Sequence, residues 1–118
     1  MARSHEKRTT PRIQPFVVPC RLIAEPRRLE CFLVELSVRG ARISGDEEPP
    51  PVGSRAVLEV RLGRQVAHSR LPVEVKWVRF TKAGRHDFGV TFVDVAPDDQ
   101  KLLDGVVEEF RQRASQLA

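Results

Sequence analysis

The sequence predicts a mainly β fold that ends in one amphipathic helix. Five stretches alternate apolar with polar residues, and segments rich in Gly, Pro, Asp or Glu lie between them. The longest stretch changes phase and is interpreted as two strands, which gives about six in all. Short strands at this spacing favour an antiparallel barrel or sandwich, and alternation alone does not decide whether the sheet closes. The end of the chain instead places apolar side chains at helical spacing.

Each strand is predicted from its own alternation. The stretches occupy residues 16–23, 29–44, 55–63, 71–80 and 88–95. Within 55–63, one face carries Ala56, Leu58, Val60 and Leu62. Within 71–80 the apolar residues in phase are Leu71, Val73, Val75 and Trp77, and within 88–95 they are Phe88, Val90 and Phe92. Since alternate residues of a strand share a face, we expect these side chains in the core.

The stretch at residues 29–44 changes phase along its length. In its first half the apolar residues share one parity and are expected to face the core: Phe32, Val34, Leu36 and Val38. The opposite parity holds three polar residues that we expect to face outward: Glu35, Ser37 and Arg39. After Gly40 the apolar parity moves to Ala41 and Ile43, so a β-bulge or sharp bend is predicted at Gly40.

The helix is predicted over about residues 97–117. Pro97 suits the first helical position, and Asp98 and Asp99 complement the positive end of the helix dipole. The apolar face that would cover the sheet contains Leu102, Leu103, Val106, Val107, Phe110, Ala114 and Leu117.

Composition limits the classes of function. The formal net charge is +4 and the sequence pI is about 9.7, which suits an anionic partner without naming it. The N-terminus lacks the apolar region of a signal peptide, and no stretch approaches the ~20 apolar residues of a membrane span. We therefore expect a cytoplasmic protein that is not inserted in a membrane. Cys20 and Cys31, without metal-ligand spacing, are expected to be small buried thiols.

The first residues differ from the rest of the chain. Residues 1–12 contain four cations against Glu6: Arg3, Lys7, Arg8 and Arg12. They lack apolar periodicity, and Pro11 disfavours a helix there. We expect a flexible basic arm at residues 1–12, followed by a single barrel domain at residues 13–118. The arm could fold across the strand face that carries Glu35 and Ser37.

Two motifs carry a resemblance to a known family. The segment RTTPR at residues 8–12 matches an R-x-x-x-R signature, and ELSVRG at residues 35–40 is similar to D/N-x-S-x-x-G. Downstream, VEVKWVR and FGVTF are similar to later strands of the same family. On these residues the chain resembles PilZ domains, which are bacterial receptors for cyclic di-GMP. The resemblance implies a PilZ-like, six-stranded antiparallel β-barrel with a C-terminal helix, acting as a stand-alone receptor without catalysis.

The resemblance also implies a ligand site. Its candidate residues are Lys7, Arg8, Arg12, Glu35, Ser37, Arg39 and Gly40. Arg8 and Arg12 would grip the ligand, because a guanidinium pairs with phosphate oxygens, bonds guanine edges and stacks on bases. Ser37 would bond the ligand from the strand face, and Gly40 would leave room for it. No catalytic residue and no metal ligand is expected.

Two positions affect how cyclic di-GMP would bind. Glu35 stands where the family has Asp or Asn, so its carboxylate can still accept from guanine but is displaced by roughly 1–1.5 Å, one C–C bond. We expect weakened or repositioned binding. Lys7 precedes the R-x-x-x-R motif, a position that the resemblance links to ligand number. One or two cyclic di-GMP molecules per protomer are expected.

Other readings remain open. One is a PilZ-like protein-interaction module that has lost ligand binding, and the other is a small basic barrel that binds nucleic acid. The strands show no interleaved aromatic platform, which disfavours nucleic acid. His5, His68 and His86 are scattered and lack a nucleophile nearby, so no enzyme is predicted. An unidentified downstream protein is expected as partner, and the chain could be a monomer or a homodimer.

Overall fold

The computed structural model describes residues 18–62 and 68–117, with the side chains of Phe110 and of 113–117 left aside. The elements follow in the order β1 (Val18–Ala24), β2 (Arg27–Leu36), β3 (Gly40–Gly45), β4 (Arg55–Val60), β5 (Ser69–Phe80), β6 (His86–Phe92) and α1 (Pro97–Leu117). The predicted arm at residues 1–12 and the first residues of the predicted barrel domain lie outside the described part.

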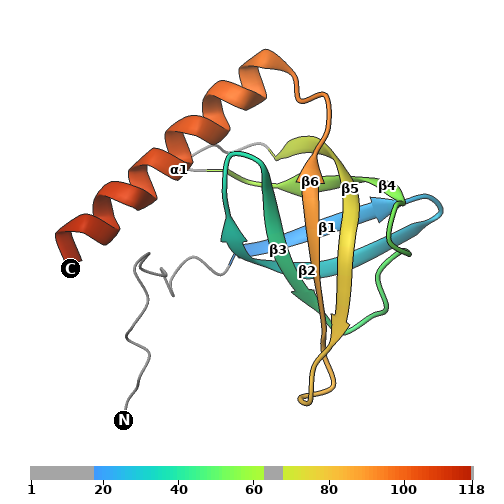
Figure 1. Ribbon diagram of the computed structural model, residues 1–118. Helices are drawn as coiled ribbons and strands as arrows, with labels where there is room; N and C mark the ends of the chain where they lie inside the picture. The colour runs from blue at the N-terminus through green and yellow to red at the C-terminus, as the bar shows by residue number, and fades with distance from the viewer. Residues whose placement is uncertain (1–17, 63–67, 118) are drawn as a thin grey trace, which may run out of the picture.

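The six strands close into an antiparallel barrel, which confirms the predicted fold class. The strand order around the barrel is β1-β2-β3-β6-β5-β4, so β6 lies between β3 and β5 (Figure 1). Four of the five connections join strands that are neighbours in the barrel. The fifth, between β3 and β4, crosses to the other side of the barrel. The closed ladder leaves each strand paired on both sides over much of its length.

The core fills the barrel interior with aliphatic side chains. Its fully buried members include Leu22, Leu29, Leu33, Ile43, Leu58, Leu71, Val73, Val75 and Phe88. Cys20 and Cys31 are opposite each other in the β1–β2 register, and both are buried free thiols, as predicted. Burial raises the pKa of Cys20 to about 12 and that of Cys31 to about 11, because the interior disfavours the thiolate.

Helix α1 follows β6 and extends away from the barrel (Figure 1). Leu103 and Val106 are buried, and Leu102 and Val107 pack against the same core. This confirms the predicted apolar face for the first half of the helix. In the part of the chain that the structure describes, no helix has the length and apolar character required to cross a membrane.

The predicted phase of residues 29–44 was wrong in its details. The buried residues of β2 are Leu29, Cys31 and Leu33, whereas Phe32 is 41% exposed and Val38 is also exposed. The register between β2 and β3 shifts between Leu33 and Glu35, so the bulge lies at Val34 and not at Gly40. The sequence pattern located the change of phase too late because Leu36, beyond the bulge, shares its parity with Phe32 and Val34.

Candidate functional site

Glu35 lies at one end of a row of residues on the outer face of the barrel. It pairs in register with Arg42 of β3, Arg42 with Gly89 of β6, and Gly89 with Trp77 of β5. Core residues occupy the opposite parity of the same strands, including Ile43. We call the four residues Glu35, Arg42, Gly89 and Trp77 the outer row.

Two bulges bring the ends of the outer row to the same face. Strict alternation after Leu33 would turn Glu35 inward, but the extra residue Val34 turns it outward. Strict alternation after Val75 would likewise bury Trp77, but the register between β5 and β6 shifts at Lys76. A bulge adds one residue to one strand only, so every side chain beyond it changes face.

Trp77 was predicted to lie in the core, and this prediction was wrong. Its side chain is 39% exposed and covers Gly89, where an added Cβ would lie 2.1 Å from the indole Nε1. The Cζ atom of Arg79 lies 5.6 Å from the centre of the Trp77 ring, within the range of a cation–π contact. Trp77 therefore presents a flat apolar surface on the outer row, with a cation beside it.

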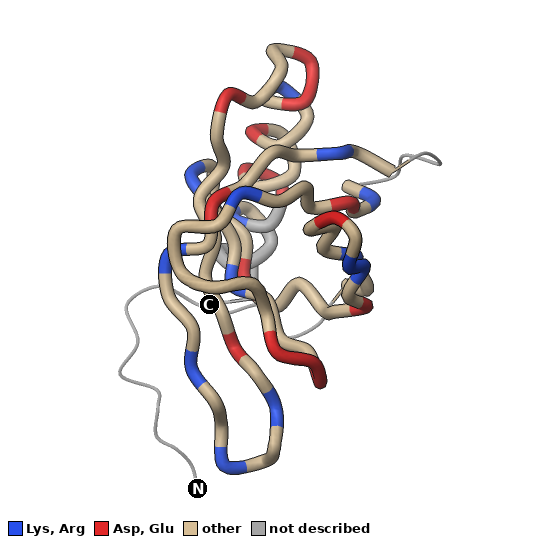
Figure 2. The backbone as a smooth tube through the Cα atoms, turned by 90° about the vertical axis from the view of Figure 1, so that its right-hand side faces the viewer, with Lys and Arg blue, Asp and Glu red and all other residues tan. Residues whose placement is uncertain are grey.

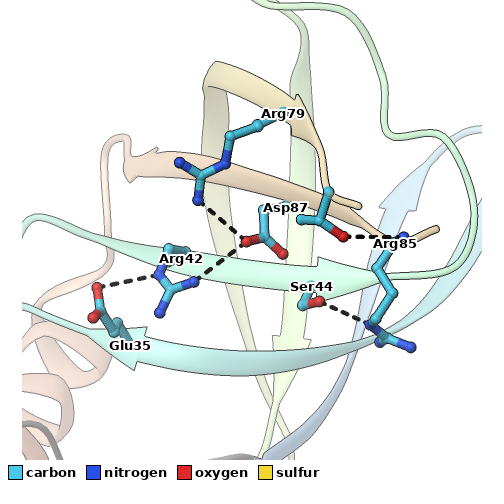
Figure 3. Close-up of polar contacts among 7 residues, drawn as sticks. Glu35, Arg42, Ser44, Arg79, Arg85 and Asp87 are labelled. Atoms are coloured by element: carbon cyan, nitrogen blue, oxygen red, sulfur yellow. Dashed lines mark hydrogen bonds and ion pairs between the residues drawn. The ribbon is translucent and has the colours of Figure 1, made fainter. Parts of the chain in front are cut away.

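A chain of ion pairs that includes Glu35 and Arg42 joins the four strands β2, β3, β6 and β5. Arg42 Nε lies 3.3 Å from Glu35 Oε1, and Arg42 Nη1 lies 3.4 Å from Asp87 Oδ2 (Figure 3). The same Asp87 oxygen lies 3.4 Å from Arg79 Nη2. Asp87 is 9% exposed, so its two guanidinium neighbours compensate a carboxylate that is largely removed from water. Arg42 is thus held between two acids, and Asp87 between two cations.

Arg85 forms a second polar cluster farther along β3 and β6. Its Nε donates to Ser44 Oγ at 3.2 Å (Figure 3). Its Nη1 lies 2.8 Å from Asp46 Oδ1. Ser44 pairs in register with Asp87, so both clusters share the outer face. The outer face of β3, β6 and β5 therefore presents guanidinium groups, carboxylates and one indole together.

Ser37, Arg39 and Gly40 form the turn between β2 and β3. The Ser37 hydroxyl accepts from the backbone N–H of Arg39 at 3.2 Å and of Gly40 at 3.1 Å, and it lies 3.3 Å from the Gly40 carbonyl. The Ser37 N–H also donates to that carbonyl at 2.9 Å. Ser37 thereby stabilises the turn, while the Arg39 side chain is exposed at its tip.

Gly40 allows β3 to approach β6 closely. A Cβ on Gly40 would lie 2.1 Å from the Val90 carbonyl oxygen, a backbone atom that has little freedom to move. The sequence predicted a bulge at Gly40 because glycine accepts backbone angles that other residues resist, but the structure gives a different reason for glycine there, which is strand packing at the start of β3. Residue 40 lies beside the end of β6, where the Arg39 carbonyl accepts from the Phe92 N–H at 2.8 Å.

The predicted site residues fall into two groups. Glu35, Ser37, Arg39 and Gly40 lie together at the end of β2, in the turn and at the start of β3. The other three, Lys7, Arg8 and Arg12, lie outside the described residues. Among the described residues, no group of three or more His, Cys, Asp or Glu is placed to hold a metal ion.

Four further residues of this face were missed by the sequence reasoning: Arg42, Trp77, Arg79 and Asp87. Their positions depend on register across three strands, which alternation within one strand does not reveal. A usable sequence pattern does exist at Trp77 and Arg79, since an aromatic residue and an arginine two apart on a strand share a face.

Comparison with known proteins identifies the family to which this chain belongs. The model of the PilZ domain family matches residues 6–109, which is most of the chain. A search of curated proteins finds no match. Among solved structures, the PilZ domain of YcgR from Escherichia coli, solved with c-di-GMP, superimposes with a TM-score of 0.64 at 17% identity. That match covers 93% of this chain and 98% of the YcgR domain.

Two larger proteins share the fold. MotI of Bacillus subtilis, an inhibitor of motility, matches with a TM-score of 0.66 at 16% identity over 88% of this chain and 51% of MotI. MrkH of K. pneumonia in its apo state matches with a TM-score of 0.72 at 14% identity over 100% of this chain and 56% of MrkH. The chain therefore spans about half the length of these two relatives. By the match of its sequence, the chain belongs to the PilZ domain family, a family of receptors and effectors for cyclic di-GMP rather than enzymes.

Proposed function

We propose that this protein is a bacterial, cytoplasmic receptor that binds cyclic di-GMP on the outer face of β2, β3, β6 and β5. The observation that carries the proposal is the outer row, which joins Glu35 of the second motif to the exposed indole of Trp77. Family membership supports the ligand class. The YcgR domain with a similar fold was solved with c-di-GMP.

The groups on this face match the chemistry of cyclic di-GMP. The ligand carries two phosphates and two guanines, so a receptor needs cations, flat surfaces and acceptors for the guanine N–H groups. Arg42 and Arg39 would supply positive charge, and Glu35 an acceptor. The exposed face of Trp77 is suited to base stacking, which contributes roughly 1–3 kcal/mol per base in single-strand binders.

Arg8 and Arg12 would complete the site from the N-terminal arm, with Lys7 beside them. Ordering the arm costs about 1–2 kcal/mol per residue fixed. Hydrogen bonds to charged groups return about 1.5–3 kcal/mol each. Two arginines and several bonds would therefore support roughly micromolar affinity, about −8 kcal/mol, after this cost. One or two ligand molecules would be held, and Lys7 would meet the additional phosphates of a second one.

Signalling would follow from closure of the arm over the outer row. The surface near residues 1–12 and Glu35 would change on binding, and an unidentified downstream protein would recognise the changed surface. Ser37 would act mainly by stabilising the β2–β3 turn, because its hydroxyl already contacts three backbone groups of Arg39 and Gly40.

Titration calorimetry with cyclic di-GMP tests the proposal. We expect the wild-type protein to bind, and Arg8→Ala to bind at least roughly tenfold more weakly because charge-assisted bonds are lost. The matched control is Arg28→Ala. Arg28 lies near the start of β2, whereas Glu35 lies near its end, so this variant should bind as the wild type does. Absence of binding by the wild type would instead favour a protein-interaction module, and equal affinity of Arg8→Ala would remove Arg8 from the site.

Hydrogen exchange tests the closure itself. Amides of residues 5–14 should gain protection when cyclic di-GMP is added, because closure orders the backbone. Binding without any gain of protection there would reject the closing arm while leaving the ligand site intact.

A further inference from the structure

Strand β5 extends beyond its neighbour β4. The β4–β5 register begins with Arg55 opposite Glu74, and two more backbone bonds join Val75 to Gly53 and Ser54. Over residues 76–80, β5 pairs with β6 on one side, and the described residues provide no strand on its other side. The β5–β6 hairpin accordingly projects from one end of the barrel (Figure 1).

The hydrogen bonds identify which backbone groups point away from β6. The Thr81 N–H donates to the Arg85 carbonyl at 2.7 Å, so residue 81 bonds toward β6. Bonded and non-bonded pairs alternate in an antiparallel ladder, so Arg79 also bonds toward β6. The backbone N–H and C=O groups of Val78 and Phe80 therefore point toward the free side. We call residues 78–80 the β5 edge.

The side chains at the β5 edge are apolar and accessible. Phe80 is 65% exposed and Val78 is 39% exposed. Phe80 has an edge-to-face contact with the ring of His86, at 4.9 Å between ring centres, which leaves most of its surface in water. An exposed apolar strand with unpaired backbone groups is a template for pairing with another strand.

The charge of the hairpin selects the kind of strand that would pair there. Residues 76–86 contain Lys76, Arg79, Lys82 and Arg85 and no carboxylate, and Figure 2 shows these cations along the hairpin. Three of them have a carboxylate partner elsewhere: Lys76 with Glu74, Arg79 with Asp87, and Arg85 with Asp46. The hairpin remains cationic at Lys82, near its tip.

A second copy of this chain fits the edge poorly. In a symmetric antiparallel pair, Val78 of one copy would lie opposite Phe80 of the other. This register places Arg79 opposite Arg79, and Lys76 opposite Lys82. Like charges directly opposite each other destabilise a strand pair. A strand with acidic residues on the face of Arg79 would instead place carboxylates beside this cation.

We propose that the β5 edge binds an extended segment of a partner protein as an added strand, and that this segment alternates apolar with acidic residues. The backbone groups of Val78 and Phe80 would supply the strand hydrogen bonds. Their side chains would contact the apolar residues of the segment. Its carboxylates, which alternate onto the other face, would lie beside the Arg79 guanidinium, whose side chain is 64% exposed. This surface differs from the outer row, and its use does not depend on cyclic di-GMP.

Amide chemical shifts of the labelled full chain test the proposal with a capped peptide of about six residues that alternates glutamate with valine. We expect saturable shifts centred on Val78 and Phe80. The same peptide with lysine in place of glutamate should bind roughly tenfold more weakly or worse, because electrostatic complementarity is reversed. Equal binding of both peptides, or no saturable shift at the β5 edge, would overturn the proposal.

Substitutions at the edge locate the binding. Val78→Pro removes an N–H that points away from β6 and should abolish peptide binding. Phe80→Glu leaves the backbone donors in place and puts a carboxylate where the apolar residues of the peptide would pack. It decides the question if Val78→Pro does not fold. The control Val52→Ala changes an exposed apolar residue outside the edge and should bind as the wild type does. Unchanged binding by Phe80→Glu would overturn the proposal.

Sedimentation of the wild type and of Phe80→Glu tests whether a second copy of the chain occupies the β5 edge. We expect no self-association through this edge. A wild-type dimer that disappears in Phe80→Glu would show that a second copy occupies the β5 edge, and it would overturn the acidic partner strand.

Discussion

Trp77 lies over Gly89, directly across the β5–β6 pair. The two residues are opposite each other in the register, and an added Cβ at Gly89 would lie 2.1 Å from the indole Nε1. The absence of a side chain at residue 89 thus lets the indole lie against the strand. The bulge at Lys76 turns Trp77 outward, and Gly89 determines how it rests there.

Gly89→Ala should displace the indole of Trp77. We expect altered tryptophan fluorescence, which is easy to assign because the chain has one Trp. Cyclic di-GMP should bind roughly five- to tenfold more weakly if Trp77 stacks on a base. Gly105→Ala, where an added Cβ meets nothing within 4 Å, is the control and should leave both measurements unchanged. A wild-type spectrum for Gly89→Ala would contradict the close packing of these two residues.

Gly40→Ala should destabilise the barrel. Its Cβ would lie 2.1 Å from the Val90 carbonyl oxygen, so β3 and β6 would have to separate within a closed sheet. We expect the free energy of unfolding to fall by about 2–4 kcal/mol, measured by urea denaturation. Gly105→Ala again serves as control, and it should be neutral or stabilise the helix by up to ~1 kcal/mol. An unchanged urea midpoint for Gly40→Ala would refute the steric role of Gly40.

Glu35→Asp should strengthen the binding of cyclic di-GMP. The longer Glu35 side chain reaches Arg42 Nε at 3.3 Å, a contact that competes with any use of its carboxylate by a ligand. Aspartate is shorter by one methylene and has one rotor less to immobilise, so we expect roughly two- to tenfold higher affinity by calorimetry. Glu30→Asp, at an exposed position of β2 paired with Arg21, is the control. Weaker binding by Glu35→Asp would show that the longer side chain fits the ligand better.

The two buried thiols should make the barrel less stable at alkaline pH. Burial raises the pKa of Cys20 to about 12 and that of Cys31 to about 11, above the value of 9.0 for an exposed thiol. The unfolded chain therefore loses its thiol protons first as the pH rises. The stability contribution is complete below pH 9. It is lost between pH 9 and about 11 for Cys31 and between pH 9 and about 12 for Cys20, by about 1.4 kcal/mol per pH unit per thiol.

Urea denaturation at a series of pH values measures this loss. The double variant Cys20→Ala/Cys31→Ala should show a smaller decline of unfolding free energy above pH 9 than the wild type. The chain has no tyrosine, which removes one group that would otherwise titrate in the same range. Parallel declines in the two proteins would exclude the thiols as the cause.

Local alternation and motif spacing in the sequence were enough to predict much of the fold and the family of this protein. They predicted a mainly β chain of six strands, the C-terminal helix and the buried thiols, and the two motifs identified the family. These features are accessible because burial of one strand face or one helix face leaves a periodic pattern within a single segment.

The tertiary structure decided which residues meet on the outer face. Glu35 was predicted to face outward and pairs with Arg42 there, but the prediction rested on a parity that Phe32 contradicts. Trp77 was assigned to the core, because its sequence phase matches that of Val75. Both outcomes depend on bulges, whose positions are set by register with a neighbouring strand. One extra residue reverses every later side chain, and a single strand read alone does not reveal where that residue lies.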